Sequence, residues 1–336
     1  MQFDSKKWLM DIISHKQSDN IPYHYDFTPP AWLKLANFYK SKEIEEILKL
    51  PIRWNSVKTV KPLYASPETY GSQLKDEFGV IWVLSKNDRG TPMPCLSEPN
   101  LLNYNFPDPS SEYRFEDMGQ WCKKNSHIFR LIIVGDLWER ATFLRGMENI
   151  LIDLKFNKKF VLNLLRKLTD YILETMEIIA GRFECEVFGL SDDYGWQNSL
   201  IISPEDWRKF IKPFLKEIVE LAKKKNKITL LHSCGHIVPI VKDFIEIGVD
   251  ILHPIQPEAN NIFMLKKEYG KYITLNGGLS TQRLLSAGTP EMIKEEIKRL
   301  KNIMGNGGGY ILEPGITIQG DVPLENLISM IEESQN

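Results

Sequence analysis

His232 and Cys234 are the two side chains whose types and spacing most directly suggest chemistry in this sequence. They end an aliphatic run, and residues two apart in a β-strand point to the same side, so the imidazole and the thiol can converge on one point. Both groups are good zinc ligands. A small buried cysteine beside a hydrogen-bonded histidine would give the same pattern. The pair therefore raises the hypothesis of a metal site without completing one.

Two adjacent carboxylates provide a second candidate group. Asp192 and Asp193, followed by Tyr194, come directly after a predicted strand at residues 186–191. Such a pair can serve as general acid and base, can contribute a metal ligand, or can cap the next segment by accepting backbone N–H groups. The residue types alone leave these three interpretations open.

Polar side chains also follow the other predicted strands. The remaining candidates are Asp136, His253, Gln256, Glu258, Asn276 and Glu313. Five of the six strand ends carry an ionisable group, which is more polar than packing alone would need. We predict substrate contacts for the first five of these side chains, although loops stabilised by their own polar groups would look similar.

These side chains can meet only if their strands end at a common edge, and the second half of the sequence predicts such an arrangement. Short aliphatic runs alternate there with amphipathic stretches, which is the pattern of repeated βα units. The predicted strands are 128–135, 186–191, 227–233, 249–253, 272–276 and 309–313. The predicted helices are 157–181, a helix opened by Ser203-Pro204 and interrupted near Pro213, 237–247, 260–269, 290–304 and 323–334. This periodicity favours a closed (β/α)8 barrel of the TIM type, whose reactive groups lie at the carboxyl ends of the strands.

The first half of the sequence is less regular. Candidate strands are 20–26, 51–58 and 79–85, and residues 89–109 are rich in Pro, Gly and polar residues. We therefore predict one barrel domain over residues 1–336. Its residues 1–126 would supply the first strand and a cap, and residues 127–336 would supply the regular βα units.

Composition excludes several classes of protein. The 336 residues are 43% hydrophobic, which argues against a disordered chain. Their formal charge of −2 argues against nonspecific electrostatic binding of nucleic acid. No apolar run approaches the roughly 18 residues of a membrane span, so we expect a cytoplasmic protein that neither enters a membrane nor binds nucleic acid. No GxGxxG or GxxxxGK[ST] motif marks a nucleotide-binding loop.

Several segments together resemble the uroporphyrinogen decarboxylase superfamily. They are VGDLWERATFLRG (134–146), LSDDYGWQNSLIISPEDWRKFIKPFL (190–215), LLHSCGHIVPIVKDFIEIGVDILHPIQPEA (230–259), LNGGLSTQRLLSAGTP (275–290) and GGGYILEPGITIQGDVPLENL (307–327). The superfamily contains the decarboxylase itself and cobalamin-dependent methyltransferases of the methylcobamide:coenzyme M type.

The H-x-C element is closer to the methyltransferase branch of this superfamily. The resemblance implies that His232 and Cys234 hold zinc, with an open position for an incoming thiol. Family members take a third ligand from the last strand, at the place of Ile316, which cannot bind metal. Glu313 or Asp193 could substitute. The implied reaction moves a methyl group between a methylcorrinoid and a thiol or similar acceptor, with a separate corrinoid protein as partner. Asp192, Asp193 and Tyr194 become catalytic candidates.

Two other functions stay open. A metal-free carboxy-lyase of porphyrin biosynthesis would need guanidinium groups for its many substrate carboxylates, and the decarboxylase branch supplies an arginine-rich segment near the amino terminus. Here the first arginine is Arg53, and the branch's FSD-type motif has no clear match between residues 50 and 90. A barrel that binds a corrinoid protein without turnover is the remaining alternative.

Overall fold

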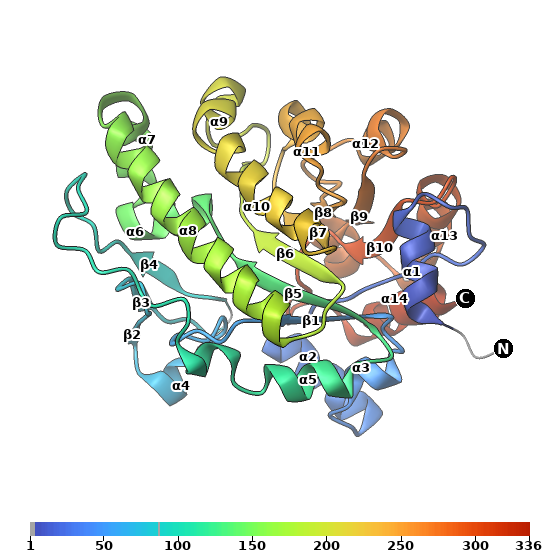
Figure 1. The fold of residues 1–336 in the computed structure, drawn as a ribbon. Helices are drawn as coiled ribbons and strands as arrows, with labels where there is room; N and C mark the ends of the chain where they lie inside the picture. Colours follow the sequence, from blue (N-terminus) through green and yellow to red (C-terminus); the bar gives the residue numbers. More distant parts are fainter. Residues whose placement is uncertain (1–3, 87) are drawn as a thin grey trace.

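The central element of the computed structural model is a curled sheet of parallel strands (Figure 1). The structure describes residues 4–86 and 88–336. The strands of this sheet are β1 (Ile52–Ser56), β5 (Phe129–Gly135), β6 (Val187–Ser191), β7 (Ile228–His232), β8 (Ile251–Ile255), β9 (Thr274–Leu279) and β10 (Tyr310–Pro314). Their spatial order is β1-β5-β6-β7-β8-β9-β10. All pairs are parallel, so the carboxyl ends of all seven strands lie at one edge of the sheet.

The segment predicted as the first strand runs beside β10. Tyr23 forms an isolated parallel bridge with Leu312, and Phe27 forms another with Ile318. The backbone N–H of Leu312 donates to the carbonyl of Pro22 at 2.8 Å. The N–H of His24 donates back to the carbonyl of Leu312 at 3.0 Å. The described chain therefore contains a seven-stranded parallel sheet with an extended segment at its edge, where the sequence predicted eight strands.

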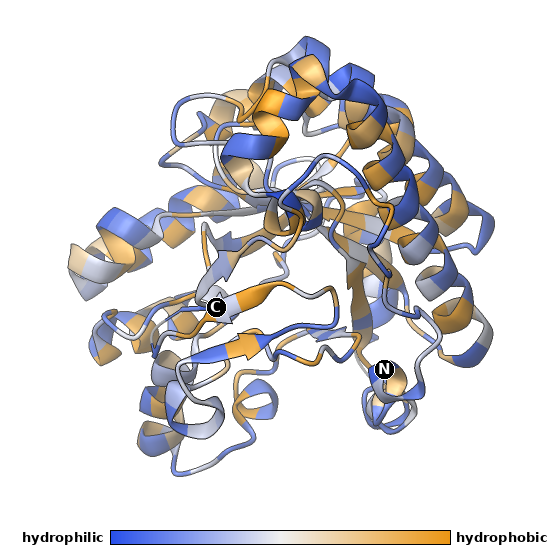
Figure 2. Ribbon diagram, turned by 90° about the vertical axis from the view of Figure 1, so that its left-hand side faces the viewer, coloured by the Kyte–Doolittle hydropathy of each residue, from blue (hydrophilic) through white to orange (hydrophobic). Residues whose placement is uncertain are grey.

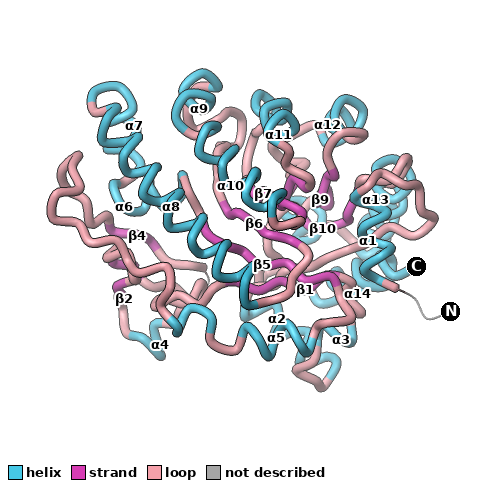
Figure 3. The backbone as a smooth tube through the Cα atoms, in the orientation of Figure 1, coloured by secondary structure: helices cyan, strands magenta, loops and turns pink. Residues whose placement is uncertain are grey.

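Helices cover the outside of the sheet, and the strands lie inside them (Figure 3). In the second half they are α6 (Trp138–Arg145), α7 (Met147–Phe156), α8 (Lys158–Arg182), α9 (Pro204–Phe210), α10 (Lys212–Lys224), α11 (Val241–Ile247), α12 (Ile262–Tyr269), α13 (Pro290–Met304) and α14 (Leu324–Gln335). Short turns η2 (Val238–Ile240) and η3 (Thr281–Leu285) precede α11 and α13. The predicted helices agree with these bounds to within a few residues, and α9 and α10 are separate helices with Pro213 in the first turn of α10.

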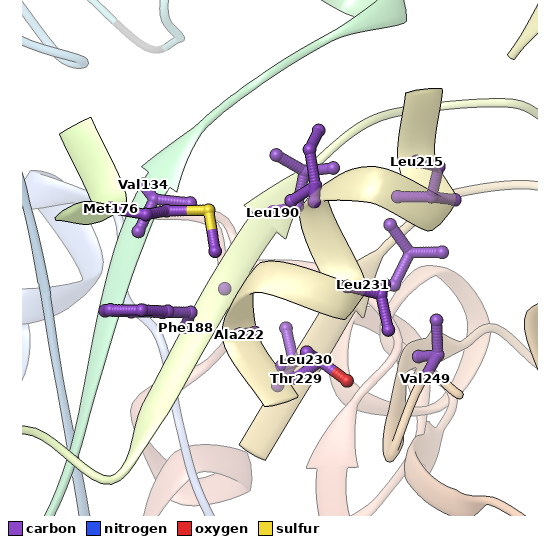
Figure 4. A pocket seen from close by; sticks show the side chains of 13 residues that line it. Val134, Met176, Phe188, Leu190, Leu215, Ala222, Thr229, Leu230, Leu231 and Val249 are labelled. Carbon is purple, nitrogen blue, oxygen red and sulfur yellow. The ribbon is translucent and has the colours of Figure 1, made fainter. Parts of the chain in front are cut away.

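The helices carry one hydrophobic and one hydrophilic face, as Figure 2 shows from the left-hand side of Figure 1. In α8 the predicted apolar stripe is buried from Phe160 to Ile179. A small apolar cavity lies between α8, α10 and the sheet, and Met176, Leu215 and Leu231 are among the side chains that line it (Figure 4). Thr229 is the polar residue of that lining. This cavity belongs to the packing between helices and sheet, and it carries no group that could do chemistry.

The first half forms short helices and a small antiparallel sheet. These elements are α1 (Ser5–Ile13), α2 (Pro29–Tyr39), α3 (Ile44–Ile47), α4 (Pro67–Tyr70), β2 (Gln73–Lys75), β3 (Ile81–Val83), β4 (Thr91–Met93), η1 (Glu112–Phe115) and α5 (Met118–Lys124). The predicted strand 51–58 is β1, whereas 79–85 contains β3 of the small sheet. Asp76 pairs with Arg140 of α6 at 3.1 Å, so the small sheet lies against the helix that follows β5. Among the described residues, no helix is long and apolar enough to cross a membrane.

Candidate metal centre

Asp193, His232 and Cys234 converge where β6 and β7 end. The Nε2 atom of His232 lies 3.4 Å from Oδ1 of Asp193 and 3.5 Å from Sγ of Cys234. One ligand atom from each residue lies within 4.8 Å of the others, and all three residues are partly buried. Among the residues that the structure describes, no other group of His, Cys and acidic side chains meets this criterion.

The three donors fit zinc. Zinc prefers tetrahedral geometry with Zn–N and Zn–O distances of about 2.1 Å and Zn–S distances of about 2.3 Å, which places neighbouring ligand atoms roughly 3.4–3.6 Å apart. The two distances from Nε2 of His232 fall in this range. Nitrogen, sulfur and oxygen are all donors that zinc accepts, and three protein ligands leave the fourth position open, as in catalytic zinc sites.

Two loops hold these donors together by backbone contacts. The N–H of Cys234 donates to Oδ1 of Asp193 at 2.8 Å, and the N–H of His236 donates to the carbonyl of Trp196 at 2.7 Å. The N–H of Gly235 donates to Oε1 of Gln256 at 2.5 Å. Gln256, which was predicted to contact substrate, is therefore engaged in fixing the turn that follows β7.

Charge is concentrated at the three candidate ligands. Burial would raise the pKa of Asp193, but the charge and hydrogen bond of His232 and the N–H of Cys234 lower it to about 2. Burial would lower the pKa of His232, but Cys234 and Asp193 outweigh it and raise this pKa well above its ordinary value. The groups around the imidazole therefore favour a positive charge at this point, and the same environment would favour a bound cation.

Asp192 and Tyr194 lie beneath the centre and are fully buried. Oδ1 of Asp192 accepts the N–H groups of Leu137 and Glu139 at 2.9 Å each, and Oδ2 accepts the Tyr194 hydroxyl at 2.9 Å. Asp192 thus caps a helix, but the helix is α6, which precedes β6 in the sequence, and not the next segment. Asp193 is the member of the pair that reaches the candidate ligands.

Asp192 leads to a prediction about pH. Burial raises its pKa to about 8, whereas an unfolded aspartate has a pKa of about 3.9. The folded protein then binds more protons than the unfolded chain between about pH 4 and pH 8, so the free energy of unfolding falls as pH rises through that window. We expect Asp192→Asn to remove this decline, measured by urea unfolding of both proteins at about pH 5 and pH 8. Equal pH dependence in the two proteins would refute the assignment.

Asp136 and Glu258 are occupied by contacts within the fold. Asp136 pairs with Arg140 at 3.1 Å, one helical turn further along the chain. Glu258 accepts the Ser280 hydroxyl at 2.6 Å and the N–H of Gln282 at 3.3 Å, next to η3. The structure thus places these two predicted substrate contacts beside other loops of the same sheet edge and outside the group of candidate ligands.

Glu313, predicted as a metal ligand, lies in a separate buried group. Its carboxylate accepts a hydrogen bond from Nδ2 of Asn276 at 2.7 Å and lies 3.0 Å from Nδ1 of His24 and 3.4 Å from Nε2 of His253. Burial would raise the pKa of Glu313, but His253 and His24 hold it well below its ordinary value. The structure brings Asp193, and not Glu313, to His232 and Cys234. The N–H of Ile316 donates to Oγ1 of Thr281 at 3.4 Å, and the isoleucine side chain has no atom that can bind a metal.

Sequence reasoning missed His24 and Arg89. His24 lies on the predicted strand 20–26, and its neighbour along the sheet is β10, so that strand assignment was the signal that could have placed it near Glu313. Arg89 pairs with Glu139 at 2.5 Å, and its positive charge helps to lower the pKa of Asp193. Arg89 had no such signal, because it follows β3 in the irregular first half.

Comparison with known protein families matches residues 134–336 to the family described as uroporphyrinogen decarboxylase (URO-D), which is more than half of the chain. The chain belongs to the uroporphyrinogen decarboxylase family. The matched residues include Asp193, His232 and Cys234, whereas His24 and Arg89 precede them. The family match therefore covers all three candidate ligands, and the small sheet lies outside it.

Relatives in this family carry two different names. A methylcobamide:CoM methyltransferase of Methanosarcina barkeri is 28% identical over 131 residues, which are 39% of this chain and 36% of the relative. A uroporphyrinogen decarboxylase of Aliarcobacter butzleri (strain RM4018) is 29% identical over 216 residues, 60% of this chain and 57% of the relative. The matches thus span less than two thirds of these relatives. A solved methyltransferase from Methanosarcina mazei has a TM-score of 0.71 at 20% identity over 99% of both chains, which shows a shared fold.

Proposed function

We propose that this protein is a zinc-dependent methyltransferase of the uroporphyrinogen decarboxylase family, which moves a methyl group between a methylcorrinoid and a thiol or similar acceptor. The observation that carries the proposal is the convergence of Asp193, His232 and Cys234 at distances that suit tetrahedral zinc. The methyltransferase relatives support the same branch of the family. The proposal includes a closed eight-stranded barrel, in which the segment 20–27 serves as the remaining strand.

Different residues of the chain would have different roles in such a reaction. Bound zinc would lower the pKa of an incoming thiol and present it as a nucleophilic thiolate. Asp193, His232 and Cys234 would hold the ion, and Gln256 would keep the turn after β7 in place. Asp192 and Tyr194 support the start of α6 from below. A corrinoid is bulky, so we propose that a separate corrinoid protein presents it at the carboxyl edge of the sheet.

The family's other activity, decarboxylation without metal, would need arginines that are free to bind substrate carboxylates, and the first arginine of the chain does not meet this need. Arg53 is the first arginine of the chain, and its side chain is only 1% exposed. Its guanidinium lies 3.4 Å from Glu45 and 3.3 Å from Glu46, so its charge is already paired. Decarboxylase relatives nevertheless match up to 69% of the chain, and this activity remains the second candidate.

Metal analysis of the purified, tag-free protein tests the proposal. We expect about one zinc per chain in the wild type and none in Cys234→Ala, because that variant loses a thiolate ligand. Cys95→Ala is the matched control, since Cys95 is an exposed free cysteine outside the ligand group, and it should keep its zinc. Zinc-loaded protein should then transfer methyl groups from methylcobalamin to at least one member of a thiol panel.

Three results would contradict the proposal in different ways. Absence of zinc from the wild type would remove the metal site and leave the metal-free carboxy-lyase in the lead, to be tested by CO2 release from uroporphyrinogen. Zinc that persists in Cys234→Ala would place the ion elsewhere. Bound zinc without methyl transfer to any thiol would favour a barrel that binds a corrinoid protein without turnover.

A further inference from the structure

A chain of buried side chains leads away from the candidate metal centre on the side opposite Asp193 and Cys234. Nδ1 of His232 lies 2.9 Å from Nδ1 of His253, its neighbour in the register of β7 and β8. Nε2 of His253 lies 3.4 Å from Oε1 of Glu313, and Nδ1 of His24 lies 3.0 Å from the same oxygen. Two histidines therefore contact one carboxylate, and His253 links it to His232. Neither His253 nor Glu313 belongs to the ligand group.

The direction of the hydrogen bonds in this row of side chains follows from Asn276 and Glu313 at its far end. Nδ2 of Asn276, which can only donate, lies 2.7 Å from Oε2 of Glu313 and 3.3 Å from the carbonyl of Ile311. Glu313 therefore accepts there, and as a carboxylate it also accepts from Nδ1 of His24 at 3.0 Å. Nε2 of His253 faces the same oxygen at 3.4 Å, and a nitrogen that faces a carboxylate is favoured to carry a hydrogen.

The same logic continues to the candidate ligand. A neutral imidazole with its hydrogen on Nε2 offers a lone pair on Nδ1. A metal ion bound at Nε2 of His232 leaves the hydrogen of that ring on Nδ1. Nδ1 of His253 must then accept this hydrogen, because two N–H groups would repel each other at 2.9 Å. The hydrogen of His232 is thereby fixed on Nδ1, and Nε2 is the nitrogen that faces Asp193 and Cys234.

We propose that His253 and Glu313 are positioning residues that hold the hydrogen of His232 on Nδ1 and so reserve Nε2 for a metal ion. The proposal rests on the proposed function, because a metal ion at Nε2 is what places the hydrogen of His232 on Nδ1. Partners of this kind fix the ring orientation and tautomer of a metal-binding histidine. The sequence predicted a substrate contact for His253 and metal ligation for Glu313, and we propose the positioning role for both residues instead.

The packing around the chain is consistent with this role. Trp54 of β1 packs against both His24 and His253. The centroid of its ring lies 5.0 Å from that of His24 and 5.1 Å from that of His253. His253 and Glu313 are 7% and 3% exposed, so water does not compete for their hydrogen bonds. An indole packed against both rings restricts their rotation.

Zinc affinity of two variants at position 253 tests the proposal. His253→Leu removes the acceptor, and we expect affinity to fall about 10- to 100-fold, the usual effect of losing such a partner. His253→Gln provides a side-chain oxygen that can accept from Nδ1 of His232, so it should recover most of the loss. His24→Gln is the matched control, since His24 contacts Glu313 without lying between Glu313 and His232. It should bind zinc as the wild type does. Competition with a chromophoric chelator measures the affinity, and thermal unfolding checks that each variant is folded.

A second measurement needs neither zinc nor a variant that folds. In metal-free wild-type protein labelled with 15N-histidine, NMR should find the hydrogen of His253 on Nε2, with Nδ1 bare, and a hydrogen on Nδ1 of His232. The opposite tautomer of His253 would overturn the proposal, as would wild-type zinc affinity in a folded His253→Leu. If the tautomers are as expected but the wild type binds no zinc, the proposed function fails and the hydrogen-bond chain stands. If zinc binds but the tautomers differ, the proposed function stands and the proposed hydrogen-bond chain is wrong.

Discussion

Asp193→Ala should weaken zinc binding by about 100-fold while leaving the protein folded. Zinc sites with several protein ligands contribute about 10–16 kcal/mol, so one ligand of three or four accounts for roughly 3 kcal/mol, which corresponds to about a factor of 100. Asp193 supplies the oxygen that lies 3.4 Å from Nε2 of His232. Chelator competition at one pH would measure the change.

Two further variants separate metal binding from support of the loop. Asp193→Asn keeps an oxygen for the N–H of Cys234 but loses the negative charge, so it should also bind zinc more weakly than the wild type. Glu139→Gln is the matched control, because Glu139 is a nearby buried carboxylate that pairs with Arg89. It should retain wild-type affinity. Wild-type affinity in Asp193→Asn would mean that Asp193 supports the loop and does not bind the metal.

The second half of the fold was predictable because its signals are local. The strand that became β5 is a near-continuous apolar run interrupted by Arg130, as expected of a strand buried on both faces. The helix α13 has the same bounds as predicted, 290–304. The first half lacked such signals. Strands β2, β3 and β4 have three residues each, which is too short for an alternating pattern to be recognised.

The candidate site was predictable in part for a similar reason. His232 and Cys234 lie two residues apart on one strand, so their convergence follows from strand geometry. The choice between Asp193 and Glu313 depends on how separate strands pack, which the sequence does not state. Glu313 lies within β10, whereas Ile316 lies two residues beyond its end, so strand spacing alone does not place the two side chains relative to each other. The structure has Glu313 beside Asn276 and His253, on β9 and β8.

The close approach of two loops explains why the ligands can meet at all. Gly235 has a φ of +81°, and a Cβ there would lie 2.7 Å from the carbonyl oxygen of Trp196 and would overlap the backbone of Gly195. Gly195 has little more room, since a Cβ there would lie 2.6 Å from the nitrogen of His236. The loops that carry Asp193 and Cys234 are thus in direct backbone contact. Even one methyl group between them must push the two ligands apart.

Gly235→Ala should therefore destabilise the protein and abolish zinc binding together. The left-handed backbone costs an alanine about 1 kcal/mol, and the steric overlap adds about 1–3 kcal/mol more. Gly307→Ala isolates the first effect, because Gly307 has a φ of +77° and no atom within 4 Å of an added Cβ. We expect this control to lose only about 1 kcal/mol in urea unfolding and to keep its zinc. Equal losses in the two variants, or zinc retained in Gly235→Ala, would show that the ligands do not depend on contact between these loops.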